Sequence, residues 1–192
     1  MSIIAETIEI LPATRPIDAV VRLPGSKSYT NRALIVAALA SGTSHLEGTL
    51  DSDDTRYMLA ALRTLGVEAE LIGGDVIEVE GVAGQIGATN AELFVGNAGT
   101  AARFLTALVA LGKGTYRIDG VPRMRERPIG PLLDALRQLG VDAQSEGGND
   151  CPPVRIESQG LAGGSVEIDG SVSSQFSSAL LLVAPCTPNG IQ

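Results

Sequence analysis

The chain has 192 residues and carries 14 Lys and Arg against 22 Asp and Glu, which gives a formal net charge of −8. That balance argues against a general nucleic-acid binder, because such proteins present a basic face to the phosphate backbone. No apolar run approaches the roughly 18 residues of a membrane helix, and the first residues lack the pattern of a signal peptide. We therefore expect a cytoplasmic protein without membrane or nucleic-acid partners, in which Cys151 and Cys186 are reduced.

The first half of the chain predicts two helices and short strands. A polar segment at residues 23–32 leads into an apolar helix, and a short strand with the single histidine, His45, follows. Asp53 and Asp54 suit the positive end of a second helix, and residues 77–80 alternate as in a strand. That second helix is marked by apolar side chains at helical spacing: Met58, Ala61, Leu62 and Leu65.

The second half repeats this order. Strands are expected at residues 116–118 and 154–156, and another apolar helix follows Gln175. Pro128 and Pro131 suit the first turn of the second helix in this half. Its two helices are marked by Phe104, Leu105, Leu108 and Val109, and then by Ile129, Leu132, Leu133 and Leu136.

An internal repeat explains these parallels. The segment ALRTLGVEA at residues 61–69 reappears as ALRQLGVDA at residues 135–143, 74 positions later, and each copy holds a glycine suited to a helix end. Arg103 follows Arg32 by 71 positions, and Gln175 follows Arg103 by 72. The repeating unit therefore has about 72 residues in the order βαβαββ.

The repeat predicts an α/β fold built as a pseudo-threefold domain of βαβαββ units. We expect units at about residues 23–93, 94–165 and 166–192, and a full third unit would extend to about residue 240. The third unit is therefore expected to be incomplete because the chain is truncated. The alternative is a third unit that is naturally short.

Residues 23–32, LPGSKSYTNR, form the first candidate site. Gly25 permits an unusual turn, and the free amides and dipole of a helix start attract anions. Lys27 adds a point charge, and Arg32 can grip a carboxylate with two hydrogen bonds. The segment lacks the Walker pattern, and the alternative is a capped helix start that faces water.

Three further segments carry similar chemistry. In residues 96–103, Gly99 allows close approach to the backbone and Thr100 can cap a helix, although the pattern is not a dinucleotide fingerprint. Residues 122–128 hold three arginines that can focus an acidic small molecule, unless they only face water. Residues 171–176 offer serine hydroxyls and amides for a phosphate, or ordinary helix capping.

The sequence gives little support for a metal site. His45 has no clustered partners for a metal, and Asp51, Asp53 and Asp54 are better explained as a solvated helix start. A Ser-His-Asp arrangement is also absent, because the single histidine stands far from the four polar segments.

The four segments together resemble the 5-enolpyruvylshikimate-3-phosphate synthase family. LPGSKSYTNRAL, GNAGTAARFL, PRMRERPIGPL and DGSVSSQFSSALL occur in the family's order and spacing. The resemblance implies the enolpyruvyl transferase fold, an inside-out α/β barrel of two domains with three βαβαββ units each and ligands between them. Residues 23–192 are then the N-terminal domain, and residues 1–22 pack with a second domain that this chain lacks.

The resemblance also implies the chemistry. The family transfers the enolpyruvyl group of phosphoenolpyruvate to the 5-hydroxyl of shikimate 3-phosphate and releases phosphate, on the shikimate pathway to chorismate and the aromatic amino acids. No metal or organic cofactor takes part, and we expect a monomer when the protein is complete. Because the family's proton-transfer carboxylates lie in the second domain, the 192-residue chain alone is expected to be inactive.

Individual residues inherit expected roles from the resemblance. Lys27 is expected to contact both substrates and to be the catalytic residue that this chain supplies. Ser28 and Arg32 are expected to hold the shikimate carboxylate. Gly99 and Arg127 are expected to line the phosphoenolpyruvate site.

The remaining roles concern the shikimate side and the helix behind the site. Thr100 is expected to pack close behind Gly99. Ser173 and Ser174 are expected to bind the 3-phosphate, and Gln175 to lie over the shikimate ring. Position 104 influences the herbicide glyphosate in this family, and it is Phe here where some members have Pro.

Three alternatives stay open at the level of the sequence. A related enolpyruvyl transferase acts on UDP-N-acetylglucosamine, but it uses a loop cysteine that residues 123–127 lack. A non-catalytic module could bind a phosphorylated small acid without turnover. A scaffolding protein would need none of the four segments for ligand binding.

Overall fold

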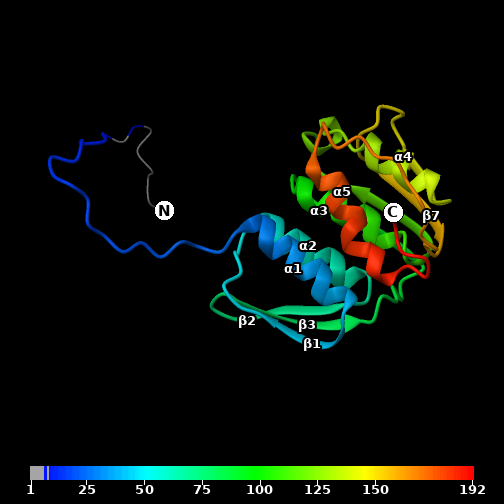
Figure 1. Ribbon diagram of the computed structural model, residues 1–192, viewed down its shortest axis with the longest axis horizontal. Helices are drawn as coiled ribbons and strands as arrows, with labels where there is room; N and C mark the ends of the chain where they lie inside the picture. The colour runs from blue at the N-terminus through cyan, green and yellow to red at the C-terminus, as the bar shows by residue number, and fades with distance from the viewer. Residues whose placement is uncertain (1–6, 8) are drawn as a thin grey trace.

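The structure is a computed structural model that describes residue 7 and residues 9–192. Residues 9–24 run as an extended chain away from the folded part, without helix or strand (Figure 1). Apolar side chains on this segment are exposed, and Val20 is fully so. The expectation for residues 1–22 falls partly on residues 1–6 and 8, which lie outside the described residues.

The first folded unit is a three-stranded antiparallel sheet with two helices on one face (Figure 1). The strand order is β1-β3-β2. Its elements are α1 (Lys27–Leu39), β1 (Ser41–Leu46), α2 (Asp53–Thr64), β2 (Glu68–Gly73) and β3 (Val76–Val82).

The second unit is a mixed four-stranded sheet in the order β4-β5-β7-β6, in which only β4 and β5 are parallel. A 3₁₀ turn, η1, precedes its second helix. The elements are β4 (Asn90–Phe94), α3 (Gly99–Val109), β5 (Lys113–Asp119), η1 (Met124–Glu126), α4 (Gly130–Gln138), β6 (Asp142–Ser145) and β7 (Val154–Gln159). After it come α5 (Ser174–Val183) and η2 (Ala184–Cys186).

The expected order of elements is complete only in the second unit. The first unit lacks its opening strand, because the residues before α1 are extended but exposed and pair with no strand in the described chain. As a result, β1 has a free edge on the side where its counterpart β5 is covered by β4. From the first helix onward, both units follow the same order of elements.

Local signals explain where the helices begin and end. Ser52 caps α2 by accepting a hydrogen bond from the Thr55 amide at 3.3 Å. Gly66 and Gly140 follow α2 and α4 with φ of +90° and +86°, which favours glycine at these helix ends. Pro128 was expected in the first turn of α4 but precedes it, because that helix starts only at Gly130.

Equivalent side chains of successive units make equivalent contacts. The Arg32 guanidinium lies 5.1 Å from the centre of the Phe104 ring, and that of Arg103 lies 5.2 Å from the centre of the Phe176 ring. Arg32 on α1 therefore reaches onto α3, and Arg103 on α3 reaches onto α5. These helices share an aliphatic core, in which nearly all of α3 is buried. Among the described residues, no helix is both long and apolar enough to span a membrane.

Candidate functional site

Four helices begin around one cleft of about 540 Å³. Its walls are the first turns of α1, α2, α3 and α5, together with the loop that joins β5 to α4. The positive ends of helix dipoles, and amides without intrahelical partners, gather at such helix starts. The topology therefore creates a place that favours anions before any charged side chain is considered.

Lys27 and Asp54 face each other across the start of α1 and α2. The Lys27 Nζ lies 3.2 Å from Asp54 Oδ2, and about half of the Lys27 side chain is exposed. Ser28 stands beside Lys27, and Asp53 and Tyr57 line the α2 side of the cleft. An exposed pair of this kind contributes at most about 1 kcal/mol, so Lys27 can exchange Asp54 for a stronger anion.

Two guanidinium groups converge over Gly99 at the start of α3. A Cβ on that residue would lie 2.6 Å from Arg127 Nη1 and 3.0 Å from Arg103 Nη1. Arg127 donates to the Asn97 carbonyl at 2.8 Å, and Arg103 donates to Gln175 Oε1 at 2.8 Å. Among the described residues, no side chain caps α3, so its first amides point toward the same place.

The electrostatics of this corner favour a bound anion. Burial, together with the nearby positive charge of Arg127, lowers the pKa of Arg103. Within the described chain, the buried Arg103 Nε has no hydrogen-bond partner. Like charges and an unpaired donor are costly in a half-buried place, and an anion offsets both costs.

Six of the predicted site residues line the cleft together. They are Lys27, Ser28, Gly99, Thr100, Arg127 and Gln175. They come from α1, α3, α5 and the loop between β5 and α4, which are distant in the sequence. The expectation that the polar segments converge in space is confirmed for these residues.

The other three predicted residues lie near this cleft but do not line it. Arg32 is half-buried over Phe104 and donates to the Ser28 carbonyl at 3.1 Å. Ser173 caps α5 by accepting a hydrogen bond from the Gln175 amide at 3.2 Å, and Ser174 is the exposed first residue of that helix.

The three arginines of residues 122–128 do not act as one cluster. Arg123 pairs with Glu126 at 2.6 Å, and Arg125 pairs with Asp119. Only Arg127 lines the cleft. The prediction of a joint positive cluster is wrong because acidic neighbours engage the other two.

Sequence reasoning missed several residues of the cleft. Asp53 and Asp54 were expected to be a solvated helix start, and the sequence offered no signal that Asp54 pairs with Lys27. Tyr57 and Asn97 also carry no motif of their own. Arg103 could have been found, because the repeat matches it to Arg32 and to Gln175.

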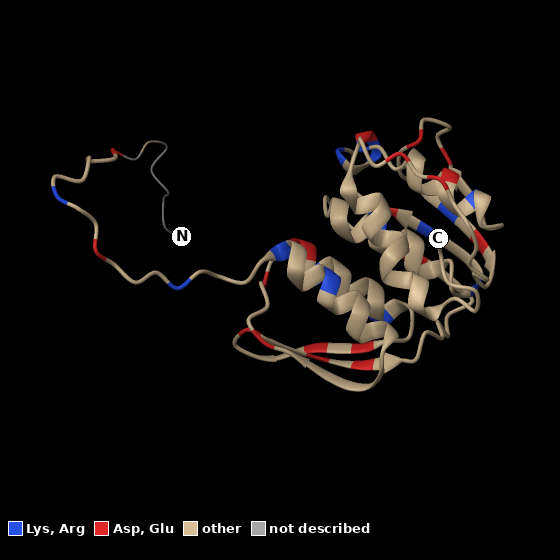
Figure 2. Cartoon of the chain, in the orientation of Figure 1, with Lys and Arg blue, Asp and Glu red and all other residues tan. Residues whose placement is uncertain are grey.

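A larger hollow, of about 710 Å³, lies on the outer side of the first sheet. Four glutamates line it against one arginine, Arg63, so its net charge repels anions; the glutamates are Glu68, Glu70, Glu78 and Glu80. Figure 2 shows acidic residues in red along the strands of this sheet. His45 belongs to the same sheet, and its Nε2 lies 2.8 Å from Glu78 Oε2. In the part of the chain that the structure describes, no three metal-ligating side chains are close enough to hold an ion.

Comparison with known proteins identifies the family. A sequence model of EPSP synthase (3-phosphoshikimate 1-carboxyvinyltransferase) matches residues 11–192. The chain belongs to the EPSP synthase family. It is similar to the 3-phosphoshikimate 1-carboxyvinyltransferases of Shewanella piezotolerans, 52% identical over 88% of this chain, and of Bordetella pertussis, 54% identical over 91%.

A solved structure of the EPSP synthase from Acinetobacter baumannii has the same fold. It matches 87% of this chain with a TM-score of 0.79 and 29% sequence identity. The chain spans about 40% of the length of the two curated EPSP synthase relatives and 38% of that structure.

Proposed function

We propose that this chain forms the shikimate-3-phosphate side of a cytoplasmic 3-phosphoshikimate 1-carboxyvinyltransferase. The complete protein transfers the enolpyruvyl group of phosphoenolpyruvate to the 5-hydroxyl of shikimate 3-phosphate. A proton adds to the methylene carbon of phosphoenolpyruvate, and the hydroxyl oxygen bonds to the adjacent carbon as the hydroxyl loses its proton. Phosphate then leaves that carbon, and a proton leaves the new methyl group, which restores the double bond of the enolpyruvyl product. In this proposal, the chain binds and orients both anionic substrates, and the remaining part supplies the proton-transfer carboxylates.

The convergence of Lys27, Arg103 and Arg127 on one cleft carries this proposal. Both substrates are phosphorylated and carry a carboxylate, so holding them side by side requires several positive charges and many hydrogen-bond donors. The cleft combines these three cations with the starts of four helices. The larger hollow on the first sheet has the opposite character, because four glutamates line it against one arginine.

Within the cleft, Lys27 contacts both substrates, and Gly99 and Arg127 line the phosphoenolpyruvate side. Thr100 lies directly behind them, because it is the second residue of α3 and is buried. Gln175 reaches the shikimate ring from α5.

The edge of the cleft supplies the remaining contacts in this proposal. Ser173 and Ser174 at the start of α5 bind the 3-phosphate, and Ser28 and Arg32 hold the shikimate carboxylate. For Arg32 this requires that its guanidinium leave the Ser28 carbonyl, to which it donates at 3.1 Å, since it does not line the cleft in this structure.

The proposal includes the finer architecture. Residues 23–192 belong to a pseudo-threefold domain of the inside-out barrel type, whose third unit is opened by α5 and completed by chain beyond residue 192. Because α2 contacts both α1 and α3, and α4 contacts both α3 and α5, a corresponding helix of the third unit would pack on α5 and α1. In support, the apolar side chains of Tyr29 and Val36 on α1, and of Leu181 on α5, are 78%, 54% and 68% exposed.

Residues 1–22 pack with the second domain in this proposal, and the complete protein acts as a monomer. The described part of that segment carries four apolar side chains that are at least 77% exposed: Ile10, Leu11, Ile17 and Val20. Exposed apolar residues along one segment indicate a surface that a partner element covers.

Calorimetry with shikimate 3-phosphate tests the proposed function on the chain as it is. We expect binding by the wild-type chain, and binding at least about tenfold weaker for Lys27→Met, because a charge-assisted contact contributes about 1.5–3 kcal/mol. Lys113→Met removes the same charge at the start of β5, outside the cleft, and should leave the affinity unchanged. Absence of binding by the wild-type chain would refute the proposal.

A further inference from the structure

The loop that carries Arg127 is anchored at both ends by backbone hydrogen bonds. At its start, the Val121 amide donates to the Gly96 carbonyl at 3.0 Å, and at its end the Ile129 amide donates to the Asp150 carbonyl at 2.8 Å. Between these anchors, Met124 is buried, but the arginines on either side reach the surface. The direction of Arg127 therefore depends on what fixes the η1 turn.

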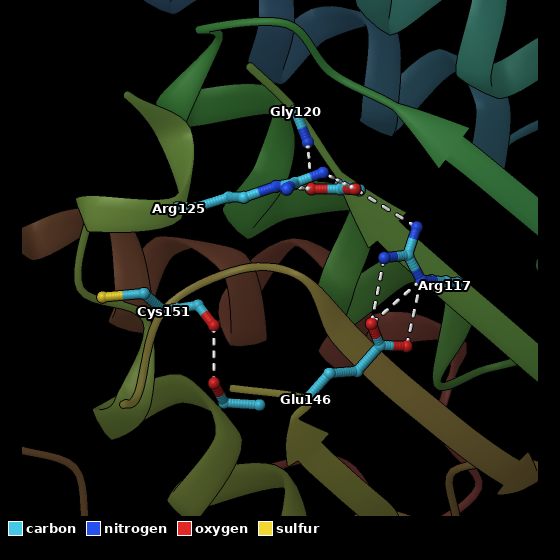
Figure 3. Close-up of polar contacts among 7 residues, drawn as sticks. Arg117, Gly120, Arg125, Glu146 and Cys151 are labelled. Atoms are coloured by element: carbon cyan, nitrogen blue, oxygen red, sulfur yellow. Dashed lines mark hydrogen bonds and ion pairs between the residues drawn. The ribbon is translucent and has the colours of Figure 1, made fainter. Parts of the chain in front are cut away.

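Asp119, the last residue of β5, holds that turn through its carboxylate. Arg125 donates to it with two nitrogens, Nε at 2.9 Å and Nη2 at 2.7 Å, and the Gly120 amide donates at 2.7 Å. Arg117 adds a contact at 3.2 Å. The Asp119 side chain is only 13% exposed, so these donors surround a largely buried group (Figure 3).

A second carboxylate extends this network away from the cleft. Arg117 Nε lies 3.0 Å from both oxygens of Glu146, the residue that follows β6 (Figure 3). The network thus ties η1 to β5 and to the residue that follows β6. A bidentate arginine–carboxylate contact has a defined geometry, so it fixes orientation as well as distance.

Arg127 needs such support, because a nearby positive charge repels its guanidinium. It faces the like charge of Arg103 across Gly99, and the hydrogen bond to Asn97 is the one side-chain hydrogen bond that the described chain gives it. The Arg127 amide donates to the Met124 carbonyl at 3.0 Å, so the η1 backbone places Arg127 directly. Movement of η1 would therefore move the guanidinium.

We propose that Asp119 is a positioning residue for the anion site: by holding Arg125, it fixes η1 so that Arg127 points into the cleft. This inference rests on the proposed role of Arg127 in binding substrate phosphate. Asp119 does not line the cleft and acts only through the loop.

Whether Asp119→Asn weakens or tightens anion binding distinguishes positioning from simple electrostatics. Replacing Asp119 by Asn removes a negative charge close to the cleft, which by itself should tighten anion binding. Positioning predicts the opposite, because Arg127 loses its direction. Glu157→Gln is the matched control: it removes the same charge from β7, the strand that pairs with β5, and Glu157 contacts Arg155 rather than the loop.

The experiment measures affinity for inorganic phosphate and for shikimate 3-phosphate, thermal stability, and the Nε–H resonance of Arg127 in the ligand-free chain. We expect Asp119→Asn to weaken binding about tenfold and to shift the Arg127 resonance, with Arg125→Gln doing the same and the double variant adding little. Glu157→Gln should change neither the affinity nor the Arg127 resonance. Arg125 is half exposed, so Arg125→Gln keeps the test valid if Asp119→Asn does not fold.

Unchanged or tighter binding by Asp119→Asn, or an unmoved Arg127 resonance, would overturn the inference even if stability falls. A lower melting temperature alone indicates that Asp119 serves the stability of the second sheet and not the site. If the wild-type chain binds neither phosphate nor shikimate 3-phosphate, the proposed function fails. In that case the Arg127 resonance in the two variants still decides whether Asp119 positions the loop.

Discussion

Gly99 sets the distance at which the two guanidiniums of the cleft can approach the backbone. We expect Gly99→Ala to weaken phosphate binding by about tenfold, because its Cβ would overlap Arg127 Nη1 at 2.6 Å and push the flexible arginine ends apart. Stability should change by less than about 1 kcal/mol, since Ala favours a helix more than Gly does. Titration with inorganic phosphate and thermal melting measure the two effects.

The control for this change is Gly87→Ala. A Cβ at Gly87 meets no atom within 4 Å, and that residue lies outside the cleft. It should leave phosphate affinity unchanged. Equal affinities for both variants would show that the approach over Gly99 does not shape the site.

The ionisation of Asp119 should appear in the pH dependence of stability. Burial raises the pKa of this carboxyl, but hydrogen bonds from Arg125 and Gly120 and the charges of Arg125 and Arg117 outweigh burial and lower it overall. A carboxyl with a lowered folded-state pKa stabilises the fold above its unfolded value of about 3.9, and this stabilisation is lost as the pH falls through the folded-state value.

Asp119→Asn isolates this contribution from the other carboxyls. At pH 7 we expect it to lower the free energy of unfolding by about 1–3 kcal/mol, since it leaves charged donors without their partner. The difference from wild type should shrink as the pH falls below about 4, because the wild-type carboxyl is then protonated too. Urea unfolding at a series of pH values measures it, and a difference that grows toward low pH would contradict this assignment.

At the scale of elements, Ser173, the residue before α5, has one observed role and one proposed role. Ser173 caps the helix, and its hydroxyl is also proposed to bind the 3-phosphate. Ser173→Ala should cost about 1 kcal/mol of stability, whereas Ser173→Gly should cost only a few tenths, because glycine is tolerated at this cap. Both variants lose the hydroxyl, so both should bind shikimate 3-phosphate about tenfold more weakly. If affinity instead follows stability across the two variants, Ser173 is only a cap.

The ends of α2 and α4 are the helix boundaries that the sequence predicted best. Local chemistry decides them, because Gly66 and Gly140 adopt the positive φ that follows each helix. The opening strand of the first unit could not be predicted in the same way. A strand depends on a partner, and residues 18–24 have none in the described chain.

The residues of the candidate site show the same contrast between local signals and contacts that depend on a partner in space. The repeat and the glycine-rich motifs predicted Lys27 and Gly99, since a helix start carries its own signal for anions. Which of the three arginines of residues 122–128 lines the cleft depends on acidic side chains that lie near them only in the folded chain. Asp119 is next to Gly120 in sequence, but its contact with Arg125 arises only when the η1 turn folds back onto β5. A single sequence contains no repeating pattern from which such tertiary contacts could be predicted.

At the scale of the whole molecule, charge is segregated. The chain is strongly acidic, yet the cations of Lys27, Arg103 and Arg127 share one cleft. Glutamates gather instead on the first sheet, whose strands carry acidic residues drawn in red in Figure 2. A charged cleft with low-dielectric walls focuses oppositely charged ligands. This cleft is open to solvent on one side, where water and salt screen its charges. We therefore expect weak substrate binding by this chain alone and turnover only when a second wall is present.

A substitution on the exposed apolar face of α1 tests how the remaining part of the protein associates with this chain. Val36→Asp should leave the 192-residue chain stable within about 0.5 kcal/mol, because the side chain is 54% exposed. The same change should weaken association with the remaining part of the protein, supplied as a separate chain, since it puts a charge where we propose that the third unit packs. Leu71→Asp is the control, because Leu71 is 43% exposed on β2 and away from this face.

Phosphate release from phosphoenolpyruvate and shikimate 3-phosphate provides the functional measurement for these chains. We expect no turnover from the 192-residue chain alone and restored turnover when the remaining part is added. Val36→Asp should reduce the restored rate at limiting concentrations, and excess partner should recover it, because the change affects association rather than chemistry. Turnover by the 192-residue chain alone would contradict the proposed division of the site. Equal complementation by Val36→Asp and wild type would show that the α1 face remains uncovered in the complete protein.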